Sequence, residues 1–220
     1  MELSKRQVKE NNIIEAAIKV ISNSGYRNAK MDEIAKQAGI TKVTLYSYFQ
    51  SKENLYLAVI YRTFQALTEV FYDTIDKHKS ETGLRSTVAI FDSFFSFCEQ
   101  NFLYSETMLD YFSMIRMISR EPQMGDFDQS ITDNLYFTKI QDLQNLPIKL
   151  TVKEIERGRR DGSIKPTVDP MLHTIQGWTM VVGYIKLISA SGKNDLPLMT
   201  VNLKSLRSLS LQLSEAALRS

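Results

Sequence analysis

The stretch that decides the fold is KMDEIAKQAGITKVTLYSYFQSK, which runs from Lys30 to Lys52. Apolar residues at helical spacing predict a short helix that ends before Gly39, where a tight turn needs a residue in the left-handed conformation. A second short helix is predicted from Lys42 to about Tyr48. Two short helices joined by a turn that contains glycine are typical of the helix-turn-helix, whose second helix lies in the major groove of DNA.

The segments on both sides of this stretch predict further helices. An amphipathic helix over 5–24 precedes it, and a long helix over 52–78 follows, with Ser51 as the N-cap. Later helical patterns cover 84–120 with a bend near Phe102, 129–157 with a break or kink at Pro147, 170–190, and 198–218. Since no segment shows the alternation of a strand, we expect an all-α fold of about nine helices.

The overall charge says little about partners, because 27 basic residues face 25 acidic ones for a net charge of +2. Residues 1–62 carry ten basic and six acidic side chains, so a mild positive excess lies around the helix-turn-helix. The single cysteine, Cys98, excludes an intrachain disulfide, and its phenylalanine neighbours predict that it is buried. No apolar run approaches the roughly 18 residues of a membrane span, so we expect a cytoplasmic protein without membrane contact.

The sequence contains no His-rich metal spacing, no Glu-x-x-His pair and no glycine-rich phosphate loop. We therefore expect no catalytic residues, no bound metal and no cofactor. An all-α enzyme stays open as an alternative, because His78 and His173 are distant in sequence but not necessarily in space. A dimeric DNA-binding protein with a solid core and no ligand is the third alternative.

The first 60 residues resemble the TetR family of bacterial transcriptional regulators. The residues that carry the resemblance are Gly25-Tyr26, Met31-x-x-Ile34-Ala35, Ala38-Gly39-Ile40-Thr41 and Thr44-Leu45-Tyr46-x-Tyr48-Phe49-x-Ser51-Lys52-Glu53-x-Leu55. A weaker match, Gly158-x-x-x-Gly162-x-Ile164-x-Pro166-x-x-Asp169-Pro170, is similar to the segment before the family's dimerisation helices. The resemblance implies a DNA-binding domain over 1–53 and a larger helical domain for effector binding and dimerisation over 54–220.

By this resemblance the chain is a homodimer that binds a palindromic operator on double-stranded DNA, in most such cases as a repressor. The residues expected to contact DNA are Lys30, Thr41, Lys42, Val43, Thr44, Tyr46, Tyr48 and Lys52. Lys30 stands where the family usually has Thr or Ser, so a charge replaces the capping hydroxyl at the start of that helix. Lys52 lies at the positive end of a helix, where a bound phosphate would favour it. For Tyr46, packing in the small core is an equally open alternative.

The segment 84–120 is rich in Phe, Tyr and Met at helical spacing, a pattern that usually forms core. The resemblance makes this region the expected pocket for a small apolar or aromatic effector. The expected lining residues are Phe91, Phe95, Met108, Tyr111, Phe112 and Met114, with Tyr136, His173 and Trp178 as polar groups. For the helix over 170–190, the apolar face expected to pack is Leu172, Ile175, Thr179, Val182 and Ile185, with Gly177 and Gly183 allowing close backbone approach.

Overall fold

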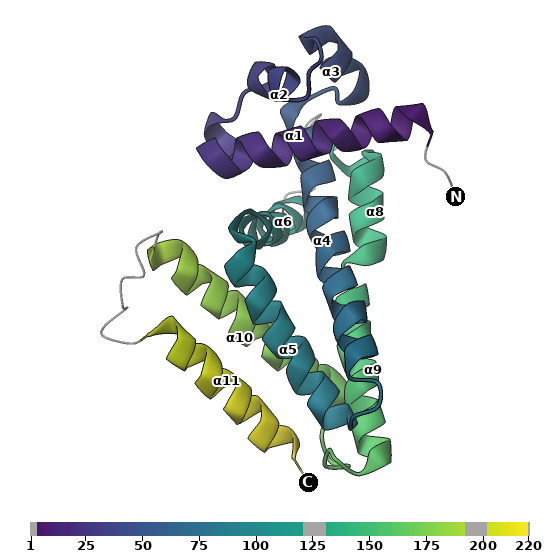
Figure 1. Ribbon diagram of the computed structural model, residues 1–220, viewed down its shortest axis with the longest axis vertical. Coiled ribbons are helices and arrows are strands. Elements are labelled where there is room, and N and C mark those ends of the chain that lie inside the picture. Colours follow the sequence, from purple (N-terminus) through teal and green to yellow (C-terminus); the bar gives the residue numbers. More distant parts are fainter. Residues whose placement is uncertain (1–3, 121–130, 192–201, 220) are drawn as a thin grey trace. The chain divides into compact units, whose positions relative to one another are not determined.

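The computed structural model describes residues 4–120, 131–191 and 202–219, and it confirms the all-α fold (Figure 1). Within these ranges the helices are α1 (Lys5–Asn28), α2 (Met31–Gln37), α3 (Lys42–Tyr48), α4 (Lys52–Lys77), α5 (Gly83–Gln100), α6 (Phe102–Arg120), α8 (Leu135–Leu143), α9 (Leu146–Asp161), α10 (Pro170–Ser191) and α11 (Leu203–Leu218). The same ranges contain no strand, and their single β-type pairing is a bridge between Ile164 and Arg219. No helix in them has the length and apolar character that crossing a membrane requires.

The chain divides by its contacts into two compact units. Unit 1 comprises Met1–Thr63 and Asp110–Gln141, and unit 2 comprises Phe64–Leu109 and Asp142–Ser220. Helices α4, α6 and α8 each contribute residues to both units. The domain boundary expected after Glu53 does not coincide with the division into these units, and it stays a prediction.

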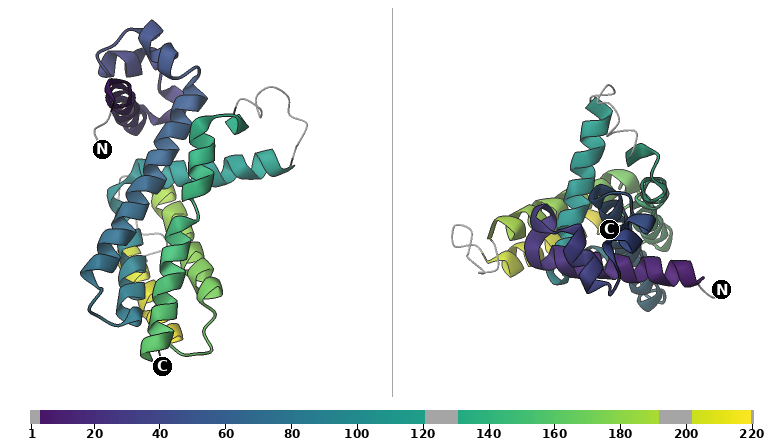
Figure 2. Two further views of the ribbon diagram at one scale, coloured as in Figure 1. Left: turned by 90° about the vertical axis from the view of Figure 1, so that its right-hand side faces the viewer. Right: turned by 90° about the horizontal axis from the view of Figure 1, so that it is seen from above.

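Unit 1 holds the three N-terminal helices around a small apolar core. Helix α1 runs beneath α2 and α3 (Figures 1 and 2). The core side chains contributed by these helices and the residue after α3 are Ile13, Ile14, Ala17, Ile21, Ile34, Ala35, Leu45 and Phe49. Helix α1 extends four residues beyond the predicted end, because the chain kinks at Gly25 and the N–H of Ala29 still donates to the Gly25 carbonyl.

Unit 2 is built around α5, which packs against α9, α10 and α11 (Figures 1 and 2). The buried face of α5 carries Phe91, Phe94, Phe95 and Cys98, as its spacing predicted. Burial raises the pKa of the Cys98 thiol to about 12, so the thiol is protonated at neutral pH. Cys98 is therefore a small buried apolar group, which confirms the prediction.

The long helix predicted over 129–157 is two helices in the described part of the chain. Helix α8 ends at Leu143 and α9 begins at Leu146, with Pro147 in its first turn, a position that proline favours. The break predicted at Pro147 is thus confirmed, and the proline starts a helix instead of kinking one. Residues 129–130 and 198–201, where two predicted helices begin, lie outside the described residues.

The face that α10 buries differs from the predicted one. Of the predicted face, Leu172, Ile175 and Thr179 are exposed, Val182 is partly buried and Ile185 is buried. Trp178 and Val181, which are also buried, lie outside that face. Helix α10 is apolar on several sides, so its spacing alone did not identify the side that meets α5. Close approach is confirmed only at Gly177, where a Cβ would lie 2.1 Å from the Phe91 ring; a Cβ at Gly183 would meet nothing within 4 Å.

Candidate nucleic-acid interface

The turn between α2 and α3 is fixed by backbone geometry. Gly39 adopts a positive φ of 66°, and the N–H of Ile40 donates to the Ala35 carbonyl at 3.0 Å. Thr41 then caps α3, because its hydroxyl accepts a hydrogen bond from the N–H of Thr44 at 3.1 Å. The helix-turn-helix predicted from the sequence is therefore present, with Thr41 acting as a structural cap besides its predicted contact with DNA.

Helix α3 has one face in the core and one in solvent. Leu45 and the following Phe49 are buried, whereas Val43 is 82% exposed and Tyr46 is 42% exposed. The structure therefore favours the surface position for Tyr46 over core packing. Val43 and Tyr46 are therefore both available on the solvent side of α3, as the predicted DNA contacts require.

Tyr48 is only partly exposed, because it lies under a cation from α1. The guanidinium carbon of Arg6 is 5.5 Å from the centre of the Tyr48 ring. Thr44 is also partly exposed, and its hydroxyl is 2.9 Å from that of Thr41. Arg6 was not among the residues predicted to contact DNA, although the sequence shows this cation near the start of the first amphipathic helix.

The two unusual lysines of this region lie at helix N-termini. Lys30 is the N-cap of α2, is exposed, and makes no side-chain capping bond, which confirms the prediction of a lost cap. Lys52 opens α4, next to Ser51, whose hydroxyl accepts from the N–H of Asn54. The Lys52 ammonium donates to the Arg27 carbonyl at 3.2 Å and lies 4.5 Å from the centre of a tyrosine ring of α1. A phosphate bound at the start of α4 would contact the same Lys52 ammonium that bonds to the end of α1.

Lys42 forms an ion pair that the sequence did not predict. Its Nζ lies 2.7 Å from Oδ1 of Asp32 in the first turn of α2, and both side chains are more than half exposed. The hydrogen bond to Asp32 and its charge raise the pKa of Lys42. Five of the predicted contacts, Lys30, Thr41, Lys42, Val43 and Tyr46, are thus exposed on α2, α3 or their caps.

The residues predicted to line an effector pocket are divided between the two units. Tyr111, Phe112, Met114 and Tyr136 belong to unit 1, and Phe91, Phe95, Met108, His173 and Trp178 belong to unit 2. In unit 2, the ring centres of Phe91 and His173 are 6.3 Å apart, and Trp178 packs on Phe94 at 4.8 Å. Phe112 is exposed rather than interior.

Tyr136 connects α8 to α1 and to Phe49 at the end of α3 in unit 1. Its hydroxyl donates to the carboxylate of Glu10 on α1 at 2.7 Å, and its ring stacks on Phe49 with 6.1 Å between ring centres. Burial and the Glu10 carboxylate raise the pKa of Tyr136, so its hydroxyl keeps its proton. In unit 1, Tyr136 therefore links two helices, which the sequence did not indicate.

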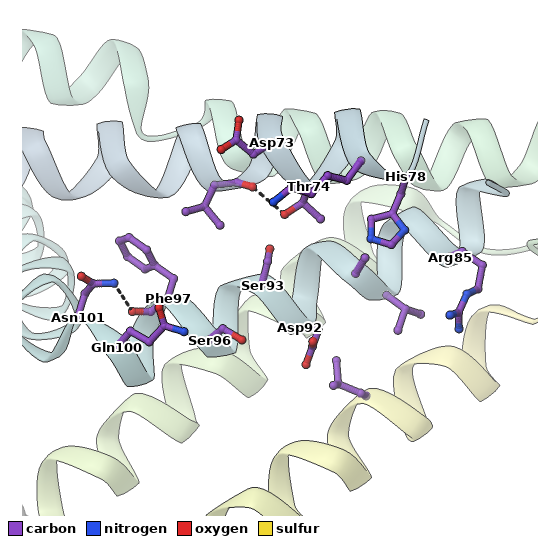
Figure 3. A pocket seen from close by; sticks show the side chains of 15 residues that line it. Asp73, Thr74, His78, Arg85, Asp92, Ser93, Ser96, Phe97, Gln100 and Asn101 are labelled. Carbon is purple, nitrogen blue, oxygen red and sulfur yellow. Dashed lines mark hydrogen bonds between the residues drawn. The ribbon is translucent and has the colours of Figure 1, made fainter. Parts of the chain in front are cut away.

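Unit 2 also contains a groove of about 650 Å³ between α4, α5 and α11 (Figure 3). Its lining is Val70, Asp73, Thr74, Lys77, His78, Arg85, Val88, Ala89, Asp92, Ser93, Ser96, Phe97, Gln100, Asn101 and Leu211. None of the nine predicted pocket residues is in this set. Its lining mixes charged, hydroxyl and amide groups with apolar side chains, and so differs from the apolar pocket that was expected.

An arginine of α11 fixes that helix to α5 beside the groove. Arg207 donates to Oδ1 of Asp92 through Nε at 3.0 Å and to Oε2 of Glu99 through Nη1 at 2.7 Å. It also donates to the Ser96 hydroxyl at 2.7 Å. The sequence offered one signal for this contact, since Arg207 is the only arginine within the leucine-rich pattern of the last helix.

Comparison with known proteins places the similarity in the helix-turn-helix region. Residues 13–59 match the family model "Bacterial regulatory proteins, tetR family". The fatty acid metabolism regulator protein of Bacillus subtilis (strain 168) is 37% identical over 57 residues, which are 26% of this chain and 29% of the relative. The transcriptional activator FasR of Mycolicibacterium smegmatis is 36% identical over 96 residues, 44% of this chain and 43% of that protein. The chain thus matches less than half the length of these relatives.

Solved structures match the fold over nearly the whole chain. The transcriptional regulator FadR from Bacillus subtilis, solved in complex with stearoyl-CoA, has a TM-score of 0.63 at 19% identity. The match covers 94% of this chain and 98% of that one. At this level of identity, the likeness concerns the fold.

Proposed function

We propose that the chain is a transcriptional regulator of the TetR family and acts as a ligand-responsive repressor that binds a palindromic operator as a homodimer. The observation that carries the proposal is the exposed face of α3. Val43 and Tyr46 are exposed on this helix, next to the Thr41 and Thr44 hydroxyls and Lys42 at its N-terminus. Hydroxyls and lysines suit phosphates and base edges, whereas apolar groups suit the thymine methyl group. Such a protein acts in the cytoplasm.

The homodimer would form through the exposed apolar faces of α10 and α11. The large apolar side chains exposed on these two helices are Met171, Leu172, Ile175, Leu209 and Leu213. Soluble proteins rarely leave such a set uncovered, and a second copy of the same face would bury it symmetrically. Two copies would place two α3 helices about 34–36 Å apart, which is the spacing of successive major grooves.

For the effector, we propose an apolar molecule with one hydrogen-bond acceptor. Trp178 is buried among the aromatic side chains of unit 2, and its indole N–H has no hydrogen-bond partner in the described part of the chain. An oxygen of a ligand would satisfy that donor. Fatty acyl compounds have this chemistry and are the first to test, since the Bacillus subtilis relative is named as a fatty acid metabolism regulator.

The proposed switch is a shift between dimers with different spacing of the recognition helices. An effector that binds better to the wrongly spaced dimer weakens operator binding by its differential affinity, about 1.4 kcal/mol for each tenfold. Helix α4 is the physical link, because it starts at Lys52 beside the helix-turn-helix and continues into unit 2.

DNA binding is tested by comparing the DNA upstream of the gene with a random duplex at physiological salt. We expect the upstream region to bind more tightly, and Tyr46→Ala to weaken that binding about tenfold or more. Tyr72→Ala is the matched control, because Tyr72 is a similarly exposed tyrosine on α4 in unit 2. Equal affinity of the wild-type protein for both duplexes would show that the specific-repressor proposal is wrong.

Effector binding is tested through Trp178, the only tryptophan of the chain. Fatty acids, acyl-CoA compounds and aromatic compounds are screened for a change in its fluorescence and for a loss of affinity for the upstream DNA. A compound that changes both supports the proposal. Compounds that change the fluorescence and leave DNA affinity intact would instead support a DNA-binding protein without ligand control.

A further inference from the structure

The ion pair between Lys42 and Asp32 joins the two helices of the helix-turn-helix. Lys42 is the first residue of α3, and Asp32 lies in the first turn of α2. Both helices stand next to each other at the DNA-binding end of unit 1 (Figure 1). The pair is exposed, with 56% of the Lys42 side chain and 64% of the Asp32 side chain accessible to solvent.

The fold does not require this pair. An ion pair between exposed side chains contributes little to the free energy of unfolding. Glu33 also lies in the first turn of α2, so this N-terminus has a second carboxylate that stabilises the helix dipole. Asp32 therefore differs from Glu33 chiefly in its contact with Lys42.

The pair does change what α3 offers to DNA. A lysine that neutralises a phosphate releases a counterion, and this release drives binding to DNA of any sequence. A lysine whose ammonium lies 2.7 Å from a carboxylate is already neutralised and has less to gain from a phosphate. Lys42 is thus partly withheld from sequence-independent binding.

We propose that Asp32 restrains sequence-independent DNA binding by neutralising Lys42 at the N-terminus of the recognition helix. The inference rests on the proposed function, because it concerns how this helix-turn-helix meets DNA. In this role Asp32 increases specificity, since weaker binding to random-sequence DNA leaves more of the protein free to bind its operator. It acts through Lys42 and does not itself contact a base.

The experiment is a double-mutant cycle with Asp32→Asn, Lys42→Gln and the double variant, measured on a fluorescent random-sequence duplex of about three helical turns. Binding is followed between about 50 and 200 mM salt. We expect Asp32→Asn to tighten binding about two- to fivefold, the range that an exposed ion pair supports. The slope of log affinity against log salt should steepen by about 0.9, which corresponds to one more phosphate contact.

Glu33→Gln is the matched control, because Glu33 is exposed in the same turn and has no ion-pair partner among the described residues. It removes the same formal charge and should tighten binding less than Asp32→Asn does. In the Lys42→Gln background, Asp32→Asn should tighten binding no more than Glu33→Gln does. Asp32→Ser repeats the comparison if the asparagine variant fails to fold, as judged by circular dichroism.

Two outcomes would overturn the inference. One is equal tightening by Asp32→Asn and Glu33→Gln, and the other is a full effect of Asp32→Asn without Lys42. Either outcome would show that binding to random-sequence DNA depends on the net charge of the protein and not on the contact between Asp32 and Lys42. The preference of the wild-type protein for upstream DNA over random duplex, measured in parallel, tests the proposed function separately.

Discussion

Leu172→Ala tests whether the exposed face of α10 is a dimer interface. Leu172 is 70% exposed, although α10 is otherwise packed against α5. Fully burying a leucine side chain is worth about 1.5–3 kcal/mol, so the exposed part of Leu172 still has about 1–2 kcal/mol to gain on association. In a two-fold symmetric dimer the substitution occurs twice, which makes the loss about 2–4 kcal/mol.

That loss corresponds to a dimer dissociation constant about 30- to 1,000-fold higher than that of the wild-type protein. Sedimentation velocity over a range of protein concentrations measures this constant directly. The control is Leu135→Ala on α8, because Leu135 is also a highly exposed leucine, 63%, but lies in unit 1. If Leu172→Ala leaves the dissociation constant unchanged, or if Leu135→Ala raises it equally, the interface proposed for α10 and α11 is wrong.

Three further substitutions test packing, a helix contact and a titrating group. Gly177→Ala should lower the free energy of unfolding by about 1–3 kcal/mol in urea titration, because its Cβ would overlap a ring of α5, whereas Gly183→Ala should be neutral or stabilising by up to about 1 kcal/mol. Tyr136→Phe should cost about 0.5–1.5 kcal/mol of stability by removing the hydrogen bond to Glu10, and an unchanged urea midpoint would contradict that contact. Burial lowers the pKa of His173, so the unfolded chain takes up its proton first as the pH falls. Its contribution to stability is complete above about pH 6.5 and is lost below it, and His173→Gln should reduce this loss in melting curves recorded from pH 8 to pH 5.

The features that the sequence predicted correctly are those decided by neighbouring residues. The turn at Gly39 and the cap Ser51 depend on a few consecutive residues, and both are present. Proline in a first turn and glycine at a left-handed position are equally local signals. For the same reason, the missing cap at Lys30 could be read directly from the sequence.

The features that the sequence missed depend on residues that are distant along the chain. The hydrogen bond of Tyr136 to Glu10, 126 positions away, was not predicted. The apolar pattern of α10 fits either of two faces, and only packing on α5 selected the one with Trp178. The pairing of Lys42 with Asp32 required knowledge of how α2 and α3 meet. Helical periodicity carries none of this information.

The two faces of α3 separate residues that hold the fold together from residues at the surface, and this separation affects how the protein can evolve. Leu45 and Phe49 hold the helix in the core, whereas Val43 and Tyr46 lie on its exposed side. Under the proposed function, substitutions at these outer positions change the preferred DNA sequence while the buried residues stay the same. After a gene duplication, one copy is free to acquire a new binding site while the inherited scaffold stays intact.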